Sequence, residues 1–141
     1  MYLPPAFHED RIEIMHDFIK HQSFATLITV EEGEISANHI PFIINPELSE
    51  YGTLRGHISK GNPLWKSLDT PGKVLVIFQG ADHYISPNRY PSKKDHHKEV
   101  STWNYAVVHA HGTLNLIEDS AWLKSHLNEL TNHHERDQKQ S

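Results

Sequence analysis

Apolar residues recur every three or four positions near both ends of the chain, which is the spacing of an amphipathic helix. Segment 7–21 follows two prolines and has acidic residues near its start, where a helix favours negative charge. Its apolar positions are Ile12, Met15, Phe18 and Ile19. Near the other end, Asp119 precedes a segment from Ser120 to about His134, whose apolar stripe is Leu123, Leu127 and Leu130. The sequence therefore predicts a helix near each end, the second one capped by Asp119.

Between these helices, alternating and β-branched residues predict about six strands. They are Phe24 to Val30, Glu34 to Asn45, Thr53 to Ile58, Lys73 to Gln79, Asp82 to Ser86 pairing beside the preceding one, and Asn104 to Ile117. Glu32-Gly33 supplies a hairpin turn, and Asn62-Pro63 begins a short helix that runs through Leu68. Because hairpin connections dominate, the pattern favours a mainly β (α+β) fold, an antiparallel barrel with peripheral helices.

Two of the predicted strands have faces that differ in character. In the second strand, His39 shares a face with Ile35 and Ala37, whereas Asn38 lies on the opposite face. Pro41 has no N–H for a ladder, so this strand is expected to bend there or to lie at an edge. In the last strand one face is apolar, and the other carries Tyr105, Val107, His109, His111, Thr113 and Asn115. This alternation is typical of a sheet with one buried face.

Length, composition and charge limit the classes of protein to which this chain can belong. The chain has 141 residues, which predicts a single domain covering 1–141. It contains no cysteine, which excludes disulfides, thiolate metal sites and cysteine nucleophiles. No secretory signal or membrane span is visible, so a cytoplasmic protein without a membrane partner is expected. The net charge of −5 argues against a protein dominated by contacts to a nucleic-acid backbone. Most of the 13 histidines are expected to be solvated.

The connection from Gly80 to Tyr105 has the most unusual composition. It gathers tyrosine and tryptophan rings, two prolines, hydroxyl side chains and the pair Lys93-Lys94 between two apolar segments. Amphipathic rings beside prolines of fixed φ suit a planar, partly polar ligand or a partner chain. The alternative is a rigid loop whose rings cover the edge of the core.

Six blocks of the sequence, taken in order, carry a resemblance to a known family. They are M-Y-L-P at 1–4, L-R-G-H-I-S-K-G-N-P at 54–63, V-I-F-Q-G at 76–80, Y-I-S-P-x-x-Y-P-S-K at 84–93, T-W-N-Y at 102–105 and H-G-T-L-N-L-I-E-D at 111–119. As a set they resemble the PaiB-like, FMN-binding negative transcriptional regulators. Two positions depart from that pattern. Arg89 stands where an aromatic residue is usual, and Ser101 stands where a proline is usual.

The resemblance implies several expectations beyond the residues themselves. It implies an FMN-binding split β-barrel, and a homodimer with the flavin at the subunit interface. It also implies a role in repressing sporulation and extracellular protease genes. Family members continue further after the final helix, so a C-terminal extension is either lost from this chain or naturally absent. Any function that depends on that portion, DNA binding included, is therefore not predicted here.

An FMN phosphate needs cations and N–H donors. Arg55 and His57 share one face of a predicted strand, and Ser59-Lys60-Gly61 offers side chains and amides in the following turn. Asn62 adds a donor where the short helix starts. The sequence therefore places the phosphate at Arg55, His57, Ser59, Lys60 and Asn62. The alternative is a solvated basic turn beside a strand.

The isoalloxazine ring needs a flat apolar slot with hydrogen-bonding groups at its polar edge. For that edge the bent second strand offers Asn38 and His39, and Gln79 ends an apolar strand. Three rings are candidates to close the slot, in one chain or from the other subunit: Tyr84, Tyr90 and Trp103. Ser86 and Lys93 are within reach of the ribityl chain or phosphate. For each aromatic the alternative is core packing with one satisfied polar tip.

Other kinds of chemistry have weaker motifs. His109-x-His111 puts two rings on one strand face, roughly 6–7 Å apart, and with His57 or His39 it would make a three-histidine metal site or supply a haem ligand. No nucleotide-binding or nucleophile motif is present. A flavin-dependent oxidoreductase on the same fold is one alternative function, and a cofactor-free interaction module is another. DNA binding lacks support, because no helix-turn-helix pair is visible and the final helix mixes basic with acidic residues.

Overall fold

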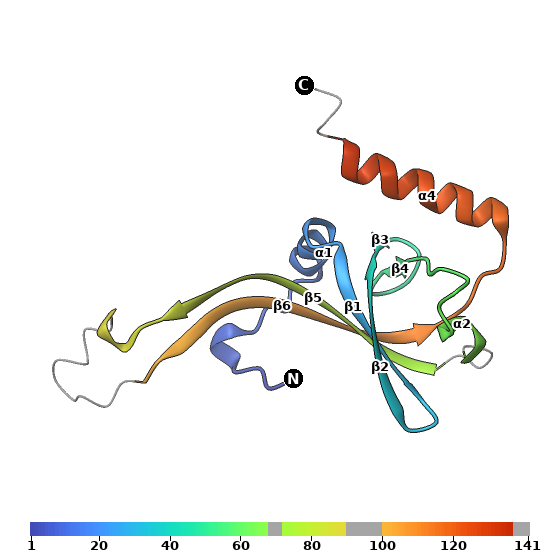
Figure 1. Ribbon diagram of the computed structural model, residues 1–141. Coiled ribbons are helices and arrows are strands. Elements are labelled where there is room, and N and C mark those ends of the chain that lie inside the picture. The colour runs from blue at the N-terminus through green and yellow to red at the C-terminus, as the bar shows by residue number, and fades with distance from the viewer. Residues whose placement is uncertain (68–71, 90–99, 137–141) are drawn as a thin grey trace.

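The computed structural model describes residues 1–67, 72–89 and 100–136, and its strands all pair in antiparallel fashion (Figure 1). Four strands form one sheet in the order β2-β1-β5-β6, and two form a separate ribbon, β3-β4. The strands are β1 (Phe24–Glu31), β2 (Glu34–Pro41), β3 (Ile43–Asn45), β4 (Thr53–Arg55), β5 (Gly72–Ile85) and β6 (Thr102–Leu114). The helices are α1 (Ile12–His21), α2 (Leu64–Ser67) and α4 (Ser120–Glu135), with 3-10 turns at Pro5–Phe7 and Pro87–Arg89. The mainly β architecture predicted from the sequence is thus confirmed.

The β1–β2 hairpin forms where the sequence predicts it. Glu32 and Gly33 adopt positive φ values of 49° and 82°. Two successive positive φ values give the turn a twist that matches the twist of the flanking strands. The resulting register places Thr26 opposite His39 and Leu27 opposite Asn38. Neighbouring residues of β2 therefore lie over different faces of the sheet.

The prediction of one strand from Glu34 to Asn45 is wrong, because the chain divides there between two sheets. β2 ends at Pro41, and β3 begins at Ile43 in the ribbon with β4. Proline cannot donate to a ladder. The N–H of Phe42 donates instead to the carbonyl of Ser23, at 2.8 Å. The bend expected at Pro41 is therefore confirmed, and it is sharp enough to end the strand.

The prediction of Lys73 to Gln79 and Asp82 to Ser86 as neighbouring strands is also wrong. They belong to one strand, β5, which pairs with β6 from Gly72–Leu114 out to Ile85–Thr102. The irregularity that resembles a break in the sequence is a register shift between Gln79 and Asp82. The outer halves of β5 and β6 project from the body as a two-stranded arm (Figure 1). We call this part, residues 82–86 and 100–105, the arm.

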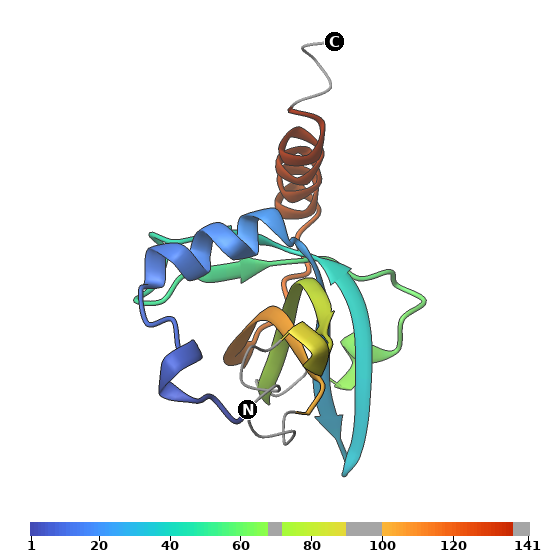
Figure 2. The ribbon, with the colours of Figure 1, turned by 90° about the vertical axis from the view of Figure 1, so that its left-hand side faces the viewer.

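One face of the four-stranded sheet packs against α1 and the β3–β4 ribbon, which together span the top of the body in Figure 2. Phe78 is fully buried at the centre, and its ring meets that of Phe42 edge to face at 6.1 Å. α1 adds Ile19, and the link between His16 Nε2 and the carbonyl of Tyr51 (2.7 Å) holds α1 to the ribbon. The other buried apolar residues are Ala25, Leu27, Ile40, Ile44, Leu64 and Val76.

No helix in the described residues is both long and apolar enough to cross a bilayer.

α4 begins as predicted but packs through an unexpected side. The carboxylate of Asp119 accepts from the N–H groups of Ala121 and Trp122, at 2.9 and 3.4 Å. Two of the three residues in the predicted apolar stripe, Leu123 and Leu127, are each 40% exposed, and the third, Leu130, is half-buried. The buried residue of α4 is instead His126. His57 gives this buried imidazole a hydrogen-bond partner at Nε2.

Gly56 allows the segment after β4 to lie against the core. A Cβ added there would sit 2.9 Å from Cε1 of Phe42, a buried ring that has little room to move. We expect Gly56→Ala to lower the free energy of unfolding by about 1–3 kcal/mol through overpacking. Gly61→Ala is the matched control, because its Cβ would make only an ordinary contact of 3.7 Å with Ser59. Urea unfolding of both variants is the measurement, and equal midpoints would contradict the prediction.

Candidate functional site

Arg55 and His57 lie where β4 ends, at an edge that α4 covers. Nη1 of Arg55 donates to Oε2 of Glu129 at 3.4 Å, and the Arg55 side chain remains 27% exposed. A partly exposed pair at this distance contributes little to stability, on the order of 0–1 kcal/mol. The guanidinium is therefore available for exchange with another anion. The prediction that both residues lie on one face of a strand from Thr53 to Ile58 is wrong, because β4 ends at Arg55 and His57 follows it. Glu129 of α4 is an additional neighbour of Arg55.

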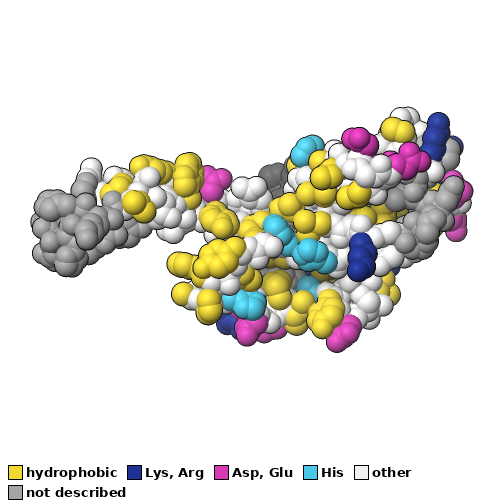
Figure 3. Space-filling view, turned by 90° about the horizontal axis from the view of Figure 1, so that it is seen from below, with side chains coloured by type: hydrophobic (Ala, Val, Ile, Leu, Met, Phe, Trp, Pro, Cys, Tyr) yellow, Lys and Arg dark blue, Asp and Glu magenta, His cyan; other side chains and the backbone are white. Residues whose placement is uncertain are grey.

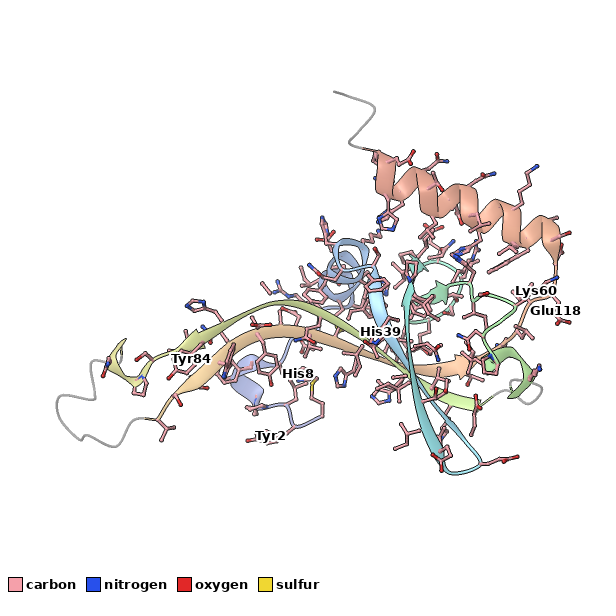
Figure 4. The ribbon with its side chains drawn as sticks, viewed as in Figure 1. Tyr2, His8, His39, Lys60, Tyr84 and Glu118 are labelled. Atoms are coloured by element: carbon pink, nitrogen blue, oxygen red, sulfur yellow. The ribbon has the colours of Figure 1, made fainter. Side chains whose placement is uncertain are left out.

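The turn after β4 has an ordered backbone. The N–H of Asn62 donates to the carbonyl of Ser59 at 2.9 Å, and the N–H of Gly61 donates to Oγ of Ser59 at 3.2 Å. Asn62 Oδ1 accepts from the N–H of Leu64, which caps α2, while Asn62 Nδ2 donates to Oδ1 of Asn38 at 2.8 Å. Asn62 therefore holds the turn against β2. Lys60 lies at the exposed end of this turn, on the same side of the body as α2 (Figure 4).

His57 contacts a buried aromatic cluster on α4. Nδ1 of His57 lies 3.3 Å from Nε2 of His126, which is only 1% exposed. The ring of Trp122 stacks on His126 with centroids 5.2 Å apart and an interplanar angle of 14°. Burial, and then the nearby His57, lower the pKa of His126, and Glu129 opposes this shift. The buried imidazole is therefore neutral near pH 7.

The sheet face that points away from the core carries a second group of histidines. His39 is linked to Oγ1 of Thr26 at 3.3 Å, and Thr26 pairs with Ile77, which in turn pairs with His109. His109 and His111 lie on this same face with ring centroids 6.5 Å apart, as their spacing predicts. Burial, the positively charged N-terminus and His111 lower the pKa of His109. Seen from below, histidines lie among hydrophobic side chains on the body (Figure 3).

These histidines do not assemble a metal site within the described part of the chain. No group of three or more His, Cys, Asp or Glu side chains there is placed to hold a metal ion. A three-histidine site would need its imidazoles to converge on one point. Of the two candidates for the third ligand, His39 belongs to β2, separated from β6 by β1 and β5, and His57 contacts His126 of α4. The three-histidine metal alternative therefore gains no geometric support from the described residues.

Asn38 and His39, the two side chains predicted at the polar edge of a flavin ring, lie on opposite faces of the sheet. Asn38 is on the core side, where it holds Asn62, and His39 is on the outer side beside Thr26 and the ring of Phe24. A planar ligand on one face reaches only one of these side chains. On the outer face that residue is His39.

The arm holds the predicted aromatic wall, far from the rest of the site. Tyr84 and Trp103 are direct partners in the β5–β6 ladder, with ring centroids 5.7 Å apart and exposed fractions of 48% and 57%. Tyr84 lies seven residues beyond Ile77 along β5. Ile77 pairs with Thr26 of β1, and Thr26 pairs with His39. At ~3.3 Å per residue this is roughly 20 Å. Within one chain, the arm therefore does not reach His39 or Lys60 (Figure 4).

Two further predicted residues, Gln79 and Ser86, lie on or just after β5. Gln79 is exposed at the register shift, and Ser86 Oγ accepts from the N–H of Asn88 at 3.3 Å. Tyr90 and Lys93 lie outside the described residues, as does the side chain of Arg89. Sequence reasoning did not identify His126, Trp122 or Glu129 as residues packed beside Arg55 and His57. Their i, i+4 and i+7 spacing on one helix face was the available signal.

Comparisons with known proteins agree with the predicted family. Residues 1–141 match the model of a family described as "Putative FMN-binding domain". The "Protease synthase and sporulation protein PAI 2" of Bacillus subtilis is 36% identical over 118 residues, which are 84% of this chain and 54% of that protein. An uncharacterised protein of Saccharomyces cerevisiae is 40% identical over 100 residues, 70% of this chain and 59% of that protein. The chain thus spans between half and two thirds of the length of these relatives.

A solved structure shares the fold. The FAD and heme binding protein from Mycobacterium smegmatis superimposes with a TM-score of 0.64, over 89% of this chain and 55% of that one. The sequences are 22% identical, so this likeness concerns the arrangement of strands and helices alone.

Proposed function

Since the chain belongs to this family of FMN-binding domains, with FMN as its cofactor, we propose that two copies form a flavin-binding dimer of the split-barrel type. In this proposal the turn after β4 holds the phosphate, and the arm of the second copy covers the ring. The observation that carries it is the separation within one chain of the basic turn from the aromatic arm.

The basic turn fits a phosphate monoester. Arg55 and Lys60 supply two cations within six residues, and His57 adds a ring N–H donor. The turn between them is ordered by Ser59 and Asn62, so little further ordering is needed on binding. The residues present therefore suit the phosphate of FMN. Bound FMN supplies one- and two-electron redox chemistry, and these side chains bind and orient it.

The arm fits a second copy of this chain. Four of its large apolar residues are exposed: Tyr84 (48%), Val100 (75%), Trp103 (57%) and Tyr105 (61%). Exposed aromatic residues on a rigid ladder that projects from the body are typical of an interaction surface. The outer sheet face offers matching apolar surface around His39, together with exposed Phe24. A two-fold arrangement would bring each arm to the other copy's outer face.

The role of such a dimer in the cell is proposed from the Bacillus relative, whose name refers to protease synthesis and sporulation. We propose a negative regulatory role exerted through the bound flavin or a partner protein rather than by direct reading of DNA. The net charge of −5 is the observation that favours the indirect route. Reduction of bound flavin by NADH or NADPH would instead favour the alternative, an oxidoreductase.

The first experiment is the visible absorption spectrum of the purified protein, with chromatography of any chromophore released on denaturation. We expect flavin bands and released FMN. A colourless protein that takes up no added FMN would overturn the proposal. Light scattering on a sizing column measures the mass in the same preparation, and a monomer at micromolar concentration would overturn the dimer.

Trp103 tests the arm as an interface. Trp103→Ala is expected to weaken the dimer by about 2 kcal/mol or more, roughly 30-fold in Kd, because a tryptophan at a buried interface is a typical hot spot. Leu48→Ala, at an exposed apolar residue on the β3–β4 connection, is the matched control. Sedimentation equilibrium gives both constants. An unchanged Kd for Trp103→Ala would show that the arm is not the interface.

A further inference from the structure

The buried histidine of α4 lies within hydrogen-bonding distance of His57. His126 is 1% exposed and stacked on Trp122, and its Nε2 lies 3.3 Å from Nδ1 of His57. The other ring nitrogen of His126, Nδ1, is buried and has no hydrogen-bond partner. One nitrogen of this ring is therefore paired, and the other is not.

This asymmetry selects one tautomer of His126. A neutral imidazole carries a single proton, on either Nδ1 or Nε2. A proton on Nδ1 would bury an N–H donor without an acceptor, which is costly. A proton on Nε2 instead donates to Nδ1 of His57. His126 is then an Nε2–H donor, and its low pKa, caused first by burial, keeps it neutral.

The tautomer of His57 follows from that of His126. Because Nδ1 of His57 accepts the hydrogen bond, its own proton resides on Nε2. The charged groups near this pair are Arg55 at the end of β4 and Glu129 one turn along α4, which contact each other. Neither takes part in the hydrogen bond between His57 Nδ1 and His126 Nε2. The Nε2–H of His57 is thus the ring donor at the edge where Arg55 lies.

We propose that His126 is a positioning residue for the cofactor site: it fixes His57 as an Nε2–H donor toward the phosphate bound at the turn after β4. This inference rests on the proposed function and makes α4 part of the flavin site. It also predicts how the site distinguishes flavins. Riboflavin lacks the phosphate, so a change at His126 should affect FMN and leave riboflavin unaffected.

Two substitutions and one native measurement test this role. His126→Leu removes the donor, and His126→Gln retains an N–H that can reach His57. We expect His126→Leu to reduce the preference for FMN over riboflavin by about 10-fold, since one hydrogen bond to a charged group is lost. We expect His126→Gln to keep most of that preference. Asn128→Ala, an exposed change on the same helix, is the control for α4.

The tautomer of His57 is measured by ¹⁵N NMR of its ring nitrogens in the flavin-free protein. The signals are assigned by their loss in a His57→Gln variant. We expect the Nε2–H tautomer in the native protein and a mixture in His126→Leu. An Nδ1–H tautomer in the native protein would overturn the inference whether or not flavin binds. So would a native preference for FMN that His126→Leu leaves unchanged. A native protein with no preference for FMN would overturn the proposed phosphate site, and the positioning role with it.

Discussion

Replacing Arg55 by alanine is expected to weaken FMN binding by about 10- to 100-fold while riboflavin binding stays nearly unchanged. A hydrogen bond to a charged group contributes about 1.5–3 kcal/mol, and a guanidinium can meet a phosphate with two parallel bonds. The Arg55 side chain is 27% exposed and held at the edge of β4. Water that enters after its removal would therefore be a poor substitute for the guanidinium as a phosphate partner. Fluorescence titration with both flavins measures the two affinities.

Arg11→Ala is the matched control for this prediction. Arg11 is an exposed arginine outside the site, and it bonds to Glu9 at 2.7 Å. Removing it changes the net charge by the same amount as removing Arg55, so it corrects for long-range electrostatics. If Arg55→Ala and Arg11→Ala gave the same FMN affinity, or if riboflavin weakened as much as FMN, the phosphate would not lie at Arg55.

Replacing Phe78 by alanine is expected to lower the free energy of unfolding by about 3–5 kcal/mol. Phe78 has no exposed surface and lies against Phe42 at the centre of the core, so its removal costs transfer energy and leaves a cavity. Domains of this kind have a total stability of about 5–15 kcal/mol. The variant should therefore be marginally stable at 37 °C.

Phe7→Ala provides the comparison, because Phe7 is a phenylalanine on the 3-10 turn Pro5–Phe7 that is 79% exposed. Its loss should change stability by less than about 1 kcal/mol in the monomer. Urea denaturation followed by circular dichroism yields both values. Similar losses for the two variants would place the centre of the core elsewhere than at Phe78.

Local signals in the sequence predict local structure well. Glu32-Gly33 gives the hairpin turn, Asp119 gives the cap of α4, and the His109-x-His111 spacing gives the observed ring separation. Each depends on residues within a few positions of one another, so the interactions that determine it lie within a single short segment. The family was also predictable, because six motifs in order identify it.

The features that the sequence does not predict depend on distant partners. At the strand break after Pro41, the N–H of Phe42 donates to the carbonyl of Ser23. No residue near Phe42 in the sequence indicates this partner. The contact between His57 and His126 joins residues 69 positions apart, and the leucine stripe of α4 suggested a different face. The roles assigned to the predicted site residues remain predictions, since contacts to FMN depend on the cofactor itself and, in the proposed dimer, on a second chain.

α4 is attached to the body by polar contacts rather than by a broad apolar surface. Its buried anchor is His126, assisted by Trp122, and its far end touches α1 through the bond of His133 to the carbonyl of Lys20 at 3.1 Å. Few buried apolar contacts place a segment among those that unfold locally before the rest of a protein. Each such excursion of α4 would release His57 from its partner. In the proposed site, hydrogen exchange in this helix would therefore report how often His57 and His126 are separated, at a free energy below that of global unfolding.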